Sequence, residues 1–353
     1  MSDTVRAALS AVVDGGTLSR EQAHRAMGAV MDGESTPAQL AALLVALRMR
    51  GETVDELAGF ASAMRERVVR VDAPAGAMDV VGTGGDGSGT FNISTTAAFI
   101  VAAAGVPVAK HGNRAITSRS GSADVLDALG VRIDHDADSA AAALRSVGFA
   151  FLFAPGFHPA MRHAGPTRRE IGVRTAFNLL GPLTNPAGTR RQLVGVGDPI
   201  AAPKLAEVLR VLGTERSLVV HGAGVDELPL DGSGVIHDVT PDGVVRREVD
   251  VAALGLVPAE TGRLAGGSPA ENAALVDAVL AGTERGPRRD VVLLNAGAAL
   301  VAAGRATDMA EGVAQAAAIL DSGAASRLVA RLRDERLAAD ATKAARAAAE
   351  VRA

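Results

Sequence analysis

Two glycine-rich loops in the first half of the chain carry the residue types of a phosphate-binding site. They span residues 82–89 and 110–114. Glycines let backbone N–H groups crowd around phosphate oxygens, and a helix that starts near Ser94 adds unpaired donors with a favourable dipole. Lys110 and Arg114 add positive charge, and Lys110 offers a compact ammonium at the tip of its loop. Together the loops predict a site for a phosphorylated ligand.

The first loop also satisfies the G-x-G-x-x-G pattern of dinucleotide sites, through Gly82, Gly84 and Gly87. That fingerprint needs a helix that begins inside the glycines and an acidic residue near the end of the second strand. Here the helix is delayed to about Thr95, and the second strand ends on Lys110. The match to a dinucleotide site is therefore weak.

A P-loop is a second alternative for the same segment. Gly84 and Gly89 have its spacing, but Thr90 and Phe91 follow where a P-loop has Lys and then Ser or Thr. A flexible surface turn stays open for either loop taken alone, because glycine clusters mark loops in general. Two such loops at one sheet edge favour the phosphate site.

Asp226 and Glu227 form an adjacent carboxylate pair just past a predicted strand at 218–220. The carboxyl ends of strands in α/β sheets are where ligands bind, and oxygen ligands of this kind suit Mg²⁺, which bridges to substrate phosphates. A solvated Asp-Glu pair in a loop is the alternative. Arg168 could clamp a planar carboxylate with its guanidinium, although most of the arginines in this Arg-rich chain are expected on the surface.

The elements that must position these residues follow from the apolar pattern. Residues 78–81 are expected to form a buried strand, a helix runs from about Thr95 to a C-cap at Gly105, and 106–109 form a second strand. Parallel strands joined by a helix bring both loops to the same sheet edge.

The first 70 or so residues are expected to form a helical module. Ser19, Thr36 and Thr53 each begin a capping-box pattern, and each precedes an apolar helical repeat such as Leu40 to Leu47. Residues 71–77 are the best linker.

Beyond the linker, strands alternate with helices, which predicts an α/β fold with a mostly parallel central sheet flanked by helices. The predicted strands are 193–196, 218–220 and 291–294, with a helix at 205–212, a hairpin over 235–251 and a terminal helix after 327. We expect a helical domain at 1–72, completed by helices near 168–190, and an α/β domain at 78–353.

Composition limits the class of protein. At 353 residues with 48% hydrophobic residues, the chain is long enough for two domains with sizeable cores. It has no cysteine, which excludes disulfides and thiolate catalysis, and no apolar run approaches a membrane span. A formal net charge of −4 disfavours broad nucleic-acid binding. We therefore expect a soluble cytoplasmic protein with no nucleic-acid or membrane partner.

Several motifs resemble the signature of the anthranilate phosphoribosyltransferase family. The segments that carry the resemblance are 82–86, 92–95, 110–114, 120–126, 172–186, 221–227 and 294–300. They occur in the family's order, and the resemblance covers roughly residues 3–335.

The resemblance implies transfer of the 5-phosphoribosyl group of phosphoribosyl pyrophosphate to the amine of anthranilate in tryptophan biosynthesis, with release of pyrophosphate. It implies Lys110, Asn113 and Arg168 as catalytic residues. The phosphoribosyl pyrophosphate site that it implies consists of Gly82, Thr83, Gly84, Gly85, Asp86, Thr90, Asn92, Ile93, Ser94, Thr95, Lys110, His111, Gly112, Asn113, Arg114, Ser118 and Ser122. The anthranilate site consists of Gly82, His111, Asn113, His158 and Arg168, where either histidine could equally be structural.

The resemblance also implies two Mg²⁺ ions per subunit, held by Asp226 and Glu227 with Ser94 contributing to one of them. It implies a homodimer formed through the helical domain.

Two alternatives from other classes remain. A pyrimidine nucleoside phosphorylase is built similarly, but its lysine loop has Ser or Thr followed by Gly-Gly directly after Lys-His, where this chain has Gly112, Asn113 and Arg114. A non-catalytic relative that binds nucleic acid is disfavoured by the intact pair Asp226 and Glu227 and by the negative net charge.

Overall fold

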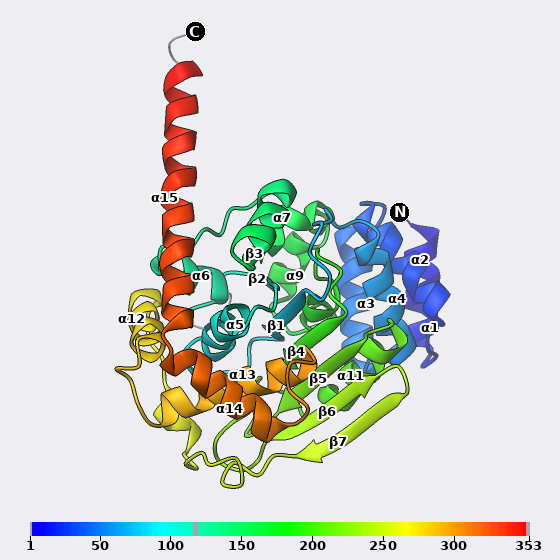
Figure 1. The fold of residues 1–353 in the computed structure, drawn as a ribbon. Coiled ribbons are helices and arrows are strands. Elements are labelled where there is room, and N and C mark those ends of the chain that lie inside the picture. The colour runs from blue at the N-terminus through cyan, green and yellow to red at the C-terminus, as the bar shows by residue number, and fades with distance from the viewer. Residues whose placement is uncertain (1, 116–118, 351–353) are drawn as a thin grey trace.

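Four N-terminal helices form a bundle at one side of the computed structural model, which describes residues 2–115 and 119–350 (Figure 1). They are α1 (Asp3–Val13), α2 (Arg20–Met31), α3 (Pro37–Arg50) and α4 (Val54–Arg65). Capping boxes at Ser19, Thr36 and Thr53 begin the last three, as the sequence predicts. Leu40 and Leu47 point into the bundle core.

Within the described residues, the strands form one seven-stranded sheet in the order β3-β2-β1-β4-β5-β6-β7. The strands are β1 (Met78–Gly82), β2 (Val108–Gly112), β3 (Phe149–Phe153), β4 (Arg191–Gly195), β5 (Arg216–His221), β6 (Val235–Thr240) and β7 (Gly243–Glu248). In this order the strands from β3 to β5 run parallel, and β6 and β7 add the predicted antiparallel hairpin. This confirms the predicted α/β fold class.

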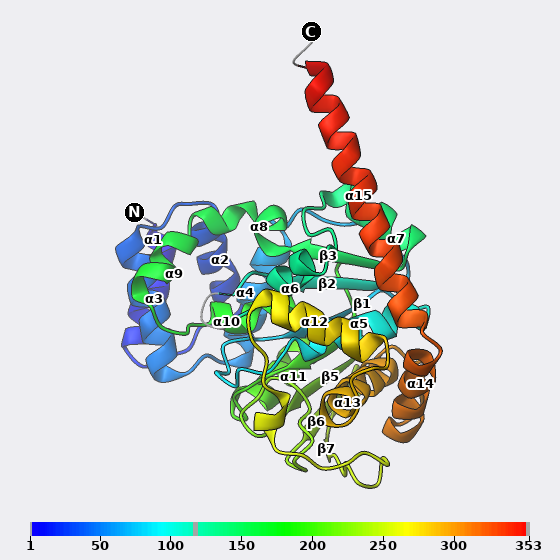
Figure 2. The same cartoon turned by 90° about the vertical axis from the view of Figure 1, so that its left-hand side faces the viewer.

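Helices cover both faces of the sheet (Figures 1 and 2). Beyond the N-terminal bundle, the described helices are α5 (Ile93–Ala103), α6 (Ser122–Ala128), α7 (Ala137–Ser146), α8 (Ala154–Phe157), α9 (Gly165–Ile171), α10 (Phe177–Leu180), α11 (Ala201–Val211), α12 (Pro269–Leu280), α13 (Pro287–Ala302), α14 (Met309–Asp321) and α15 (Ala324–Glu350), with short 3₁₀ turns η1 (Pro159–Arg162), η2 (Gly181–Leu183) and η3 (Thr261–Leu264). Leu193 and Leu218 pack with α5, α13 and α14, whereas Val194 and Val219 pack with α11. Neighbouring strand residues point to opposite faces, so both faces are buried.

The predicted strand at 291–294 is wrong, because these residues lie inside α13. Every residue of α13 from Val291 to Ala302 is buried, so the helix is apolar on all sides and shows no amphipathic period. A short apolar run of this kind does not distinguish a strand from a buried helix. Pro287 at the first helical turn was the signal for a helix.

Two of the helices that follow β3, α9 and α10, pack on the N-terminal bundle. Phe177 and Leu180 of α10 belong to the same buried cluster as the apolar side chains of α2, α3 and α4. This packing is consistent with a helical domain at 1–72 that is completed near 168–190. The division between that domain and 78–353 stays a prediction.

The chain ends in α15, which projects away from the body (Figures 1 and 2). Leu328, Val329 and Leu332 at its start are buried against the α/β core, and the distal turns extend outward as the predicted terminal helix. Among the helices of 2–115 and 119–350, none is both long and apolar enough to cross a membrane.

Candidate active site

The strand order reverses between β1 and β4, because the chain proceeds from β1 to β2 on one side and returns to β4 on the other. Ligands of open α/β sheets bind at the carboxyl ends of strands at such a point. The loop after β1 meets the loop after β5 there. The Thr83 N–H donates to the Gly195 carbonyl at 2.9 Å, and the Gly84 N–H donates to Asp226 Oδ2 at 2.6 Å.

Glycines at two strand ends make this close approach possible. A Cβ added at Gly195 would overlap the backbone carbonyl of Asp226, and one added at Gly82 would overlap the Asp226 carboxylate. In the first loop, Gly84 and Gly85 adopt φ of 67° and 66°, which side chains rarely tolerate. Sequence reasoning missed Gly195, because the residue that it contacts, Asp226, lies in the loop after a different strand, β5.

The carboxylates of Asp226 and Glu227 are not a solvated surface pair. Glu227 is only 8% exposed and accepts a hydrogen bond from the Ser94 N–H, at the start of α5, at 2.9 Å. Burial raises the pKa of Asp226 to about 7 and that of Glu227 to about 8. Repulsion adds to both shifts, since Asp86 faces Asp226 and Asp226 faces Glu227. The structure thus overturns the solvated alternative.

A bound cation would offset this charge. Mg²⁺ usually keeps several waters and binds through one or two carboxylates together with substrate phosphates. Asp226 and Glu227, with the Ser94 hydroxyl beside them, fit that pattern. Among the described residues, no three His, Cys, Asp and Glu side chains form a cluster able to cage a metal without such phosphates and waters.

Lys110 lies inside β2 and not at a loop tip, which corrects the prediction. Its side chain is buried, and its ammonium donates to the Val80 carbonyl and approaches Ser94 Oγ at 3.4 Å. Burial lowers its pKa, while Asp79, Glu227 and Asp226 oppose that shift. The ammonium is therefore attracted to the carboxylates of Asp226 and Glu227 and lies close to Ser94 at the start of α5. The strand expected at 106–109 runs instead from Val108 to Gly112.

The second glycine loop is anchored on α6. The Asn113 carbonyl accepts from Ser122 Oγ at 3.4 Å and from the Ala123 N–H at 3.2 Å. Arg114 pairs with Asp124 at 2.9 Å and with Asp127 at 3.3 Å. Its charge is thus already balanced by two carboxylates, which sequence reasoning did not anticipate. The predicted ligand Ser118 lies outside the described residues.

His111 and His158 form a buried pair, with their Nε2 atoms 3.2 Å apart. His111 Nδ1 lies 3.1 Å from the Gly181 carbonyl, which can only accept, so this nitrogen carries the proton. Burial lowers the pKa of His111 to about 3 and that of His158 to about 4, so both rings are neutral. It follows that His158 Nε2–H donates to His111 Nε2.

A polar cluster under the second loop was missed by sequence reasoning. Asp79 of β1 is fully buried, and it accepts from the His111 N–H at 3.1 Å and from Asn185 Nδ2 at 2.7 Å. Burial raises its pKa to about 6, against the nearby charge of Lys110. An acidic residue inside an apolar strand was the available signal for Asp79. Asn185 lies in a family motif, which did not reveal its partner.

Arg168 lies on α9, and its guanidinium carbon is 4.6 Å from the centre of the Phe177 ring. Burial lowers its pKa. Phe177 begins α10, which continues into η2, and the Gly181 carbonyl of η2 contacts His111. Arg168 is therefore joined through α10 and η2 to the histidine pair.

Two further predicted site residues, Thr90 and Asn92, contact a segment that lies far along the chain. Thr90 pairs with Ala265 in an isolated bridge, and Asn92 Oδ1 accepts from Asn272 Nδ2 at 3.0 Å. Ile93 is buried. In the part of the chain that the structure describes, the buried hydroxyls of Thr83 and Thr95 have no hydrogen-bond partner.

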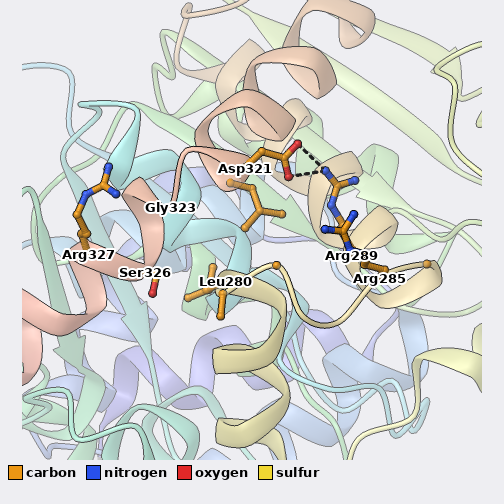
Figure 3. A pocket seen from close by; sticks show the side chains of 11 residues that line it. Leu280, Arg285, Arg289, Asp321, Gly323, Ser326 and Arg327 are labelled. Atoms are coloured by element: carbon orange, nitrogen blue, oxygen red, sulfur yellow. Dashed lines mark hydrogen bonds and ion pairs between the residues drawn. The ribbon is translucent and has the colours of Figure 1, made fainter.

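A pocket of about 690 Å³ lies elsewhere, between α12, α13, α14 and α15 (Figure 3). Arg285, Arg289 and Arg327 contribute to its lining, and Arg289 pairs there with Asp321 at 2.9 Å. None of the predicted site residues that the structure describes lines this pocket, and its charged groups include an internal ion pair. The candidate site is therefore the one at β1, β2 and β5.

A helical bundle next to an α/β body, with glycine loops and a carboxylate pair at the switch point, defines a class of glycosyl transferases. The chain matches the glycosyl transferase family a/b domain over residues 75–326 and the helical bundle domain of that family over residues 6–68. It is 53% identical over 330 residues to the anthranilate phosphoribosyltransferase of Roseiflexus sp. (strain RS-1), covering 93% of this chain and 97% of that protein.

Solved structures agree. The anthranilate phosphoribosyltransferase of Thermus thermophilus superposes with a TM-score of 0.88 at 47% identity, covering 93% of this chain and 99% of that one. The Saccharomyces cerevisiae enzyme in complex with PRPP and Mg gives a TM-score of 0.87 at 26% identity, covering 96% and 99%. The same yeast enzyme is known in complex with 4-fluoroanthranilate, with a TM-score of 0.85. This chain belongs to the anthranilate phosphoribosyltransferase family.

Proposed function

We propose that this protein transfers the 5-phosphoribosyl group of phosphoribosyl pyrophosphate to the amine of anthranilate, in tryptophan biosynthesis. The buried pair Asp226 and Glu227, facing the start of α5 and the first glycine loop, carries this proposal. Departure of pyrophosphate from the ribose demands stabilisation of developing negative charge. The loop N–H groups supply part of it, and Mg²⁺ held by the carboxylates would supply more.

Asp226, Glu227 and the Ser94 hydroxyl would hold Mg²⁺, and two ions per subunit are expected. When bound, the metal neutralises the pyrophosphate as it leaves. Lys110 acts at this site, where its charge attracts both Asp79 and the carboxylate pair. Pyrophosphate and ribose oxygens are then bound by the glycine loops, with Asn92 and Thr95 at the start of α5.

The acceptor site lies on the side of Asn113, His111, His158 and Arg168. A guanidinium whose pKa is lowered by burial gains from an anionic partner, which suits the anthranilate carboxylate. The amine needs no strong base, because an arylamine readily loses its proton once the new bond forms. A neutral histidine pair fits this, with a positioning role.

The protein is proposed to be a cytoplasmic homodimer formed through the helical bundle. The exposed face of α3 presents Val45 and Met49, which are four residues apart and therefore on one side of the helix, and Met49 is 84% exposed. Exposed apolar side chains of this size on one helix face favour burial in an interface.

Turnover with phosphoribosyl pyrophosphate, anthranilate and Mg²⁺, followed by the loss of anthranilate fluorescence, tests the proposed function. We expect turnover that needs both substrates and stops with a chelator. A parallel reaction with thymidine and inorganic phosphate tests the pyrimidine nucleoside phosphorylase alternative. Phosphorolysis without anthranilate transfer would contradict the proposal.

A further inference from the structure

Arg174 joins the helical bundle to the first glycine loop. It lies between α9 and α10, and its Nη1 donates to the Gly85 carbonyl at 2.6 Å. Arg48, in the last turn of α3, donates in turn to the Arg174 carbonyl at 2.7 Å. Two charged donors thus connect the bundle, the segment before α10 and the loop. The proposed chemistry uses neither arginine.

The contact to Gly85 fixes the direction of a peptide plane. A trans peptide is planar, so its carbonyl and its N–H point in opposite directions. When the Gly85 carbonyl points to Arg174, the N–H of Asp86 points away from Arg174. Rotation of this plane changes ψ of Gly85 and φ of Asp86, and Gly85, which has no Cβ, restricts its own backbone little, so the plane could otherwise turn over. A hydrogen bond from a charged donor opposes that rotation.

The next residue carries the effect to the carboxylates. Asp86 Oδ2 accepts from the Asp226 N–H at 3.2 Å, and Asp86 Oδ1 accepts from the Ser88 N–H at 3.1 Å. The Gly84 N–H donates to the Asp226 carboxylate. The plane that Arg174 holds therefore lies between two contacts to the Asp226 loop, one from the Gly84 N–H and one to the Asp86 side chain.

We infer that Arg174 is a positioning residue for phosphoribosyl pyrophosphate: it holds the Gly85–Asp86 peptide so that the Asp86 N–H is available to a phosphate oxygen. Arg48 holds Arg174 in place from the helical bundle. This inference rests on the proposed function, and it concerns the donor site alone. Anthranilate binding is expected to be independent of it.

Arg174→Ala tests the inference. A hydrogen bond to a charged group is lost, so the KM for phosphoribosyl pyrophosphate should rise about tenfold, while the KM for anthranilate changes less than about twofold. Arg174→Lys keeps the charge but not the planar fork, and it should recover only part of the effect. Arg48→Ala should raise the same KM less, because it removes only the support of Arg174.

The matched control is Arg191→Ala, which removes an arginine-to-carbonyl bond of equal length, 2.6 Å to Ala303, away from the site. It should leave both KM values unchanged. Equal rises in both KM values, an unchanged donor KM in Arg174→Ala, or the same rise in Arg191→Ala would overturn the inference. Calorimetric titration of phosphoribosyl pyrophosphate with Mg²⁺ gives the donor affinity without turnover. It tests Arg174 even if the wild type fails to use anthranilate, which would contradict the proposed function alone.

Discussion

At the scale of single residues, the carboxylate pair stands out by its strongly raised pKa values. Asp226 and Glu227 are buried beside one another, and Asp86 adds a third carboxylate. In the metal-free protein their charged forms are disfavoured, which makes a divalent cation a strong partner. Because burial disfavours their charged forms, the pair lowers the stability of the folded protein at alkaline pH, where both groups ionise.

The double variant Asp226→Asn, Glu227→Gln should lose Mg²⁺-dependent turnover but gain stability at high pH. Both folded pKa values, about 7 and about 8, lie above the ordinary values of 3.8 and 4.5. Such groups contribute stability that is fully present below about pH 4 and is lost as the pH rises through 7 and 8. Thermal melts without metal, from pH 5 to 8.5, should show the variant gaining on the wild type. The assignment would be contradicted if the melting temperatures of variant and wild type changed in parallel with pH. It would also be contradicted if the variant turned over at the wild-type rate in magnesium.

Arg168→Ala should remove discrimination by the acceptor carboxylate. Loss of a charge-assisted pair costs on the order of 2–4 kcal/mol, or roughly 30- to 1,000-fold in kcat/KM for anthranilate. Aniline lacks the carboxylate, so its kcat/KM, which is already lower in the wild type, should change little in Arg168→Ala. Titration of each substrate separately should show unchanged donor affinity. The neighbouring exposed Arg169→Ala is the control, and retained discrimination against aniline in Arg168→Ala would refute the clamp.

At the scale of elements, the site depends on how closely the β5 loop lies on β4. Gly195 ends β4 and leaves no room for a side chain beneath the Asp226 carbonyl. The N-terminus of α5 then meets Glu227 from the other side. Strand ends and a helix start thus position the carboxylates.

Gly195→Ala should displace the Asp226 loop. Overpacking of a tight contact costs about 1–3 kcal/mol, so thermal stability and Mg²⁺-dependent binding of phosphoribosyl pyrophosphate should both fall. Gly262→Ala is the control, because a Cβ there meets no atom within 4 Å. Equal behaviour of the two variants in melts and titrations would show that the approach of the loop is not critical.

At the scale of the whole molecule, the helical bundle both exposes an apolar face and holds the site through Arg48. A homodimer built on α3 would therefore add rigidity to the element that supports Arg174. The projecting half of α15 lies at the opposite side of the molecule (Figure 1).

Met49→Glu should convert the proposed homodimer into monomers, because a charge on the apolar face of α3 is costly to bury in an interface. Sedimentation velocity at several concentrations measures this directly. Leu337→Glu is the matched control, since Leu337 is also exposed, at 68%, but on α15. A dimer that persists in Met49→Glu, or one lost in Leu337→Glu, would place the interface elsewhere.

The sequence by itself determined the features that depend on neighbouring residues. The capping boxes at Ser19, Thr36 and Thr53, the strand before Gly82 and the hairpin over 235–251 follow from local hydrogen bonds and apolar periods. The motifs also indicated the family and the position of the glycine loops. These signals need no knowledge of distant contacts.

Only the tertiary structure decided where charges and glycines meet across the sheet. It placed Lys110 in a buried strand, bound Arg114 to Asp124, and made Gly195 a contact of Asp226. It also showed that 291–294 are helical. The sequence did not indicate this, because α13 is buried on all sides and so lacks the apolar period of an amphipathic helix. Such features arise from residues far apart in the chain, and their energies depend on burial and partners that a local pattern does not contain.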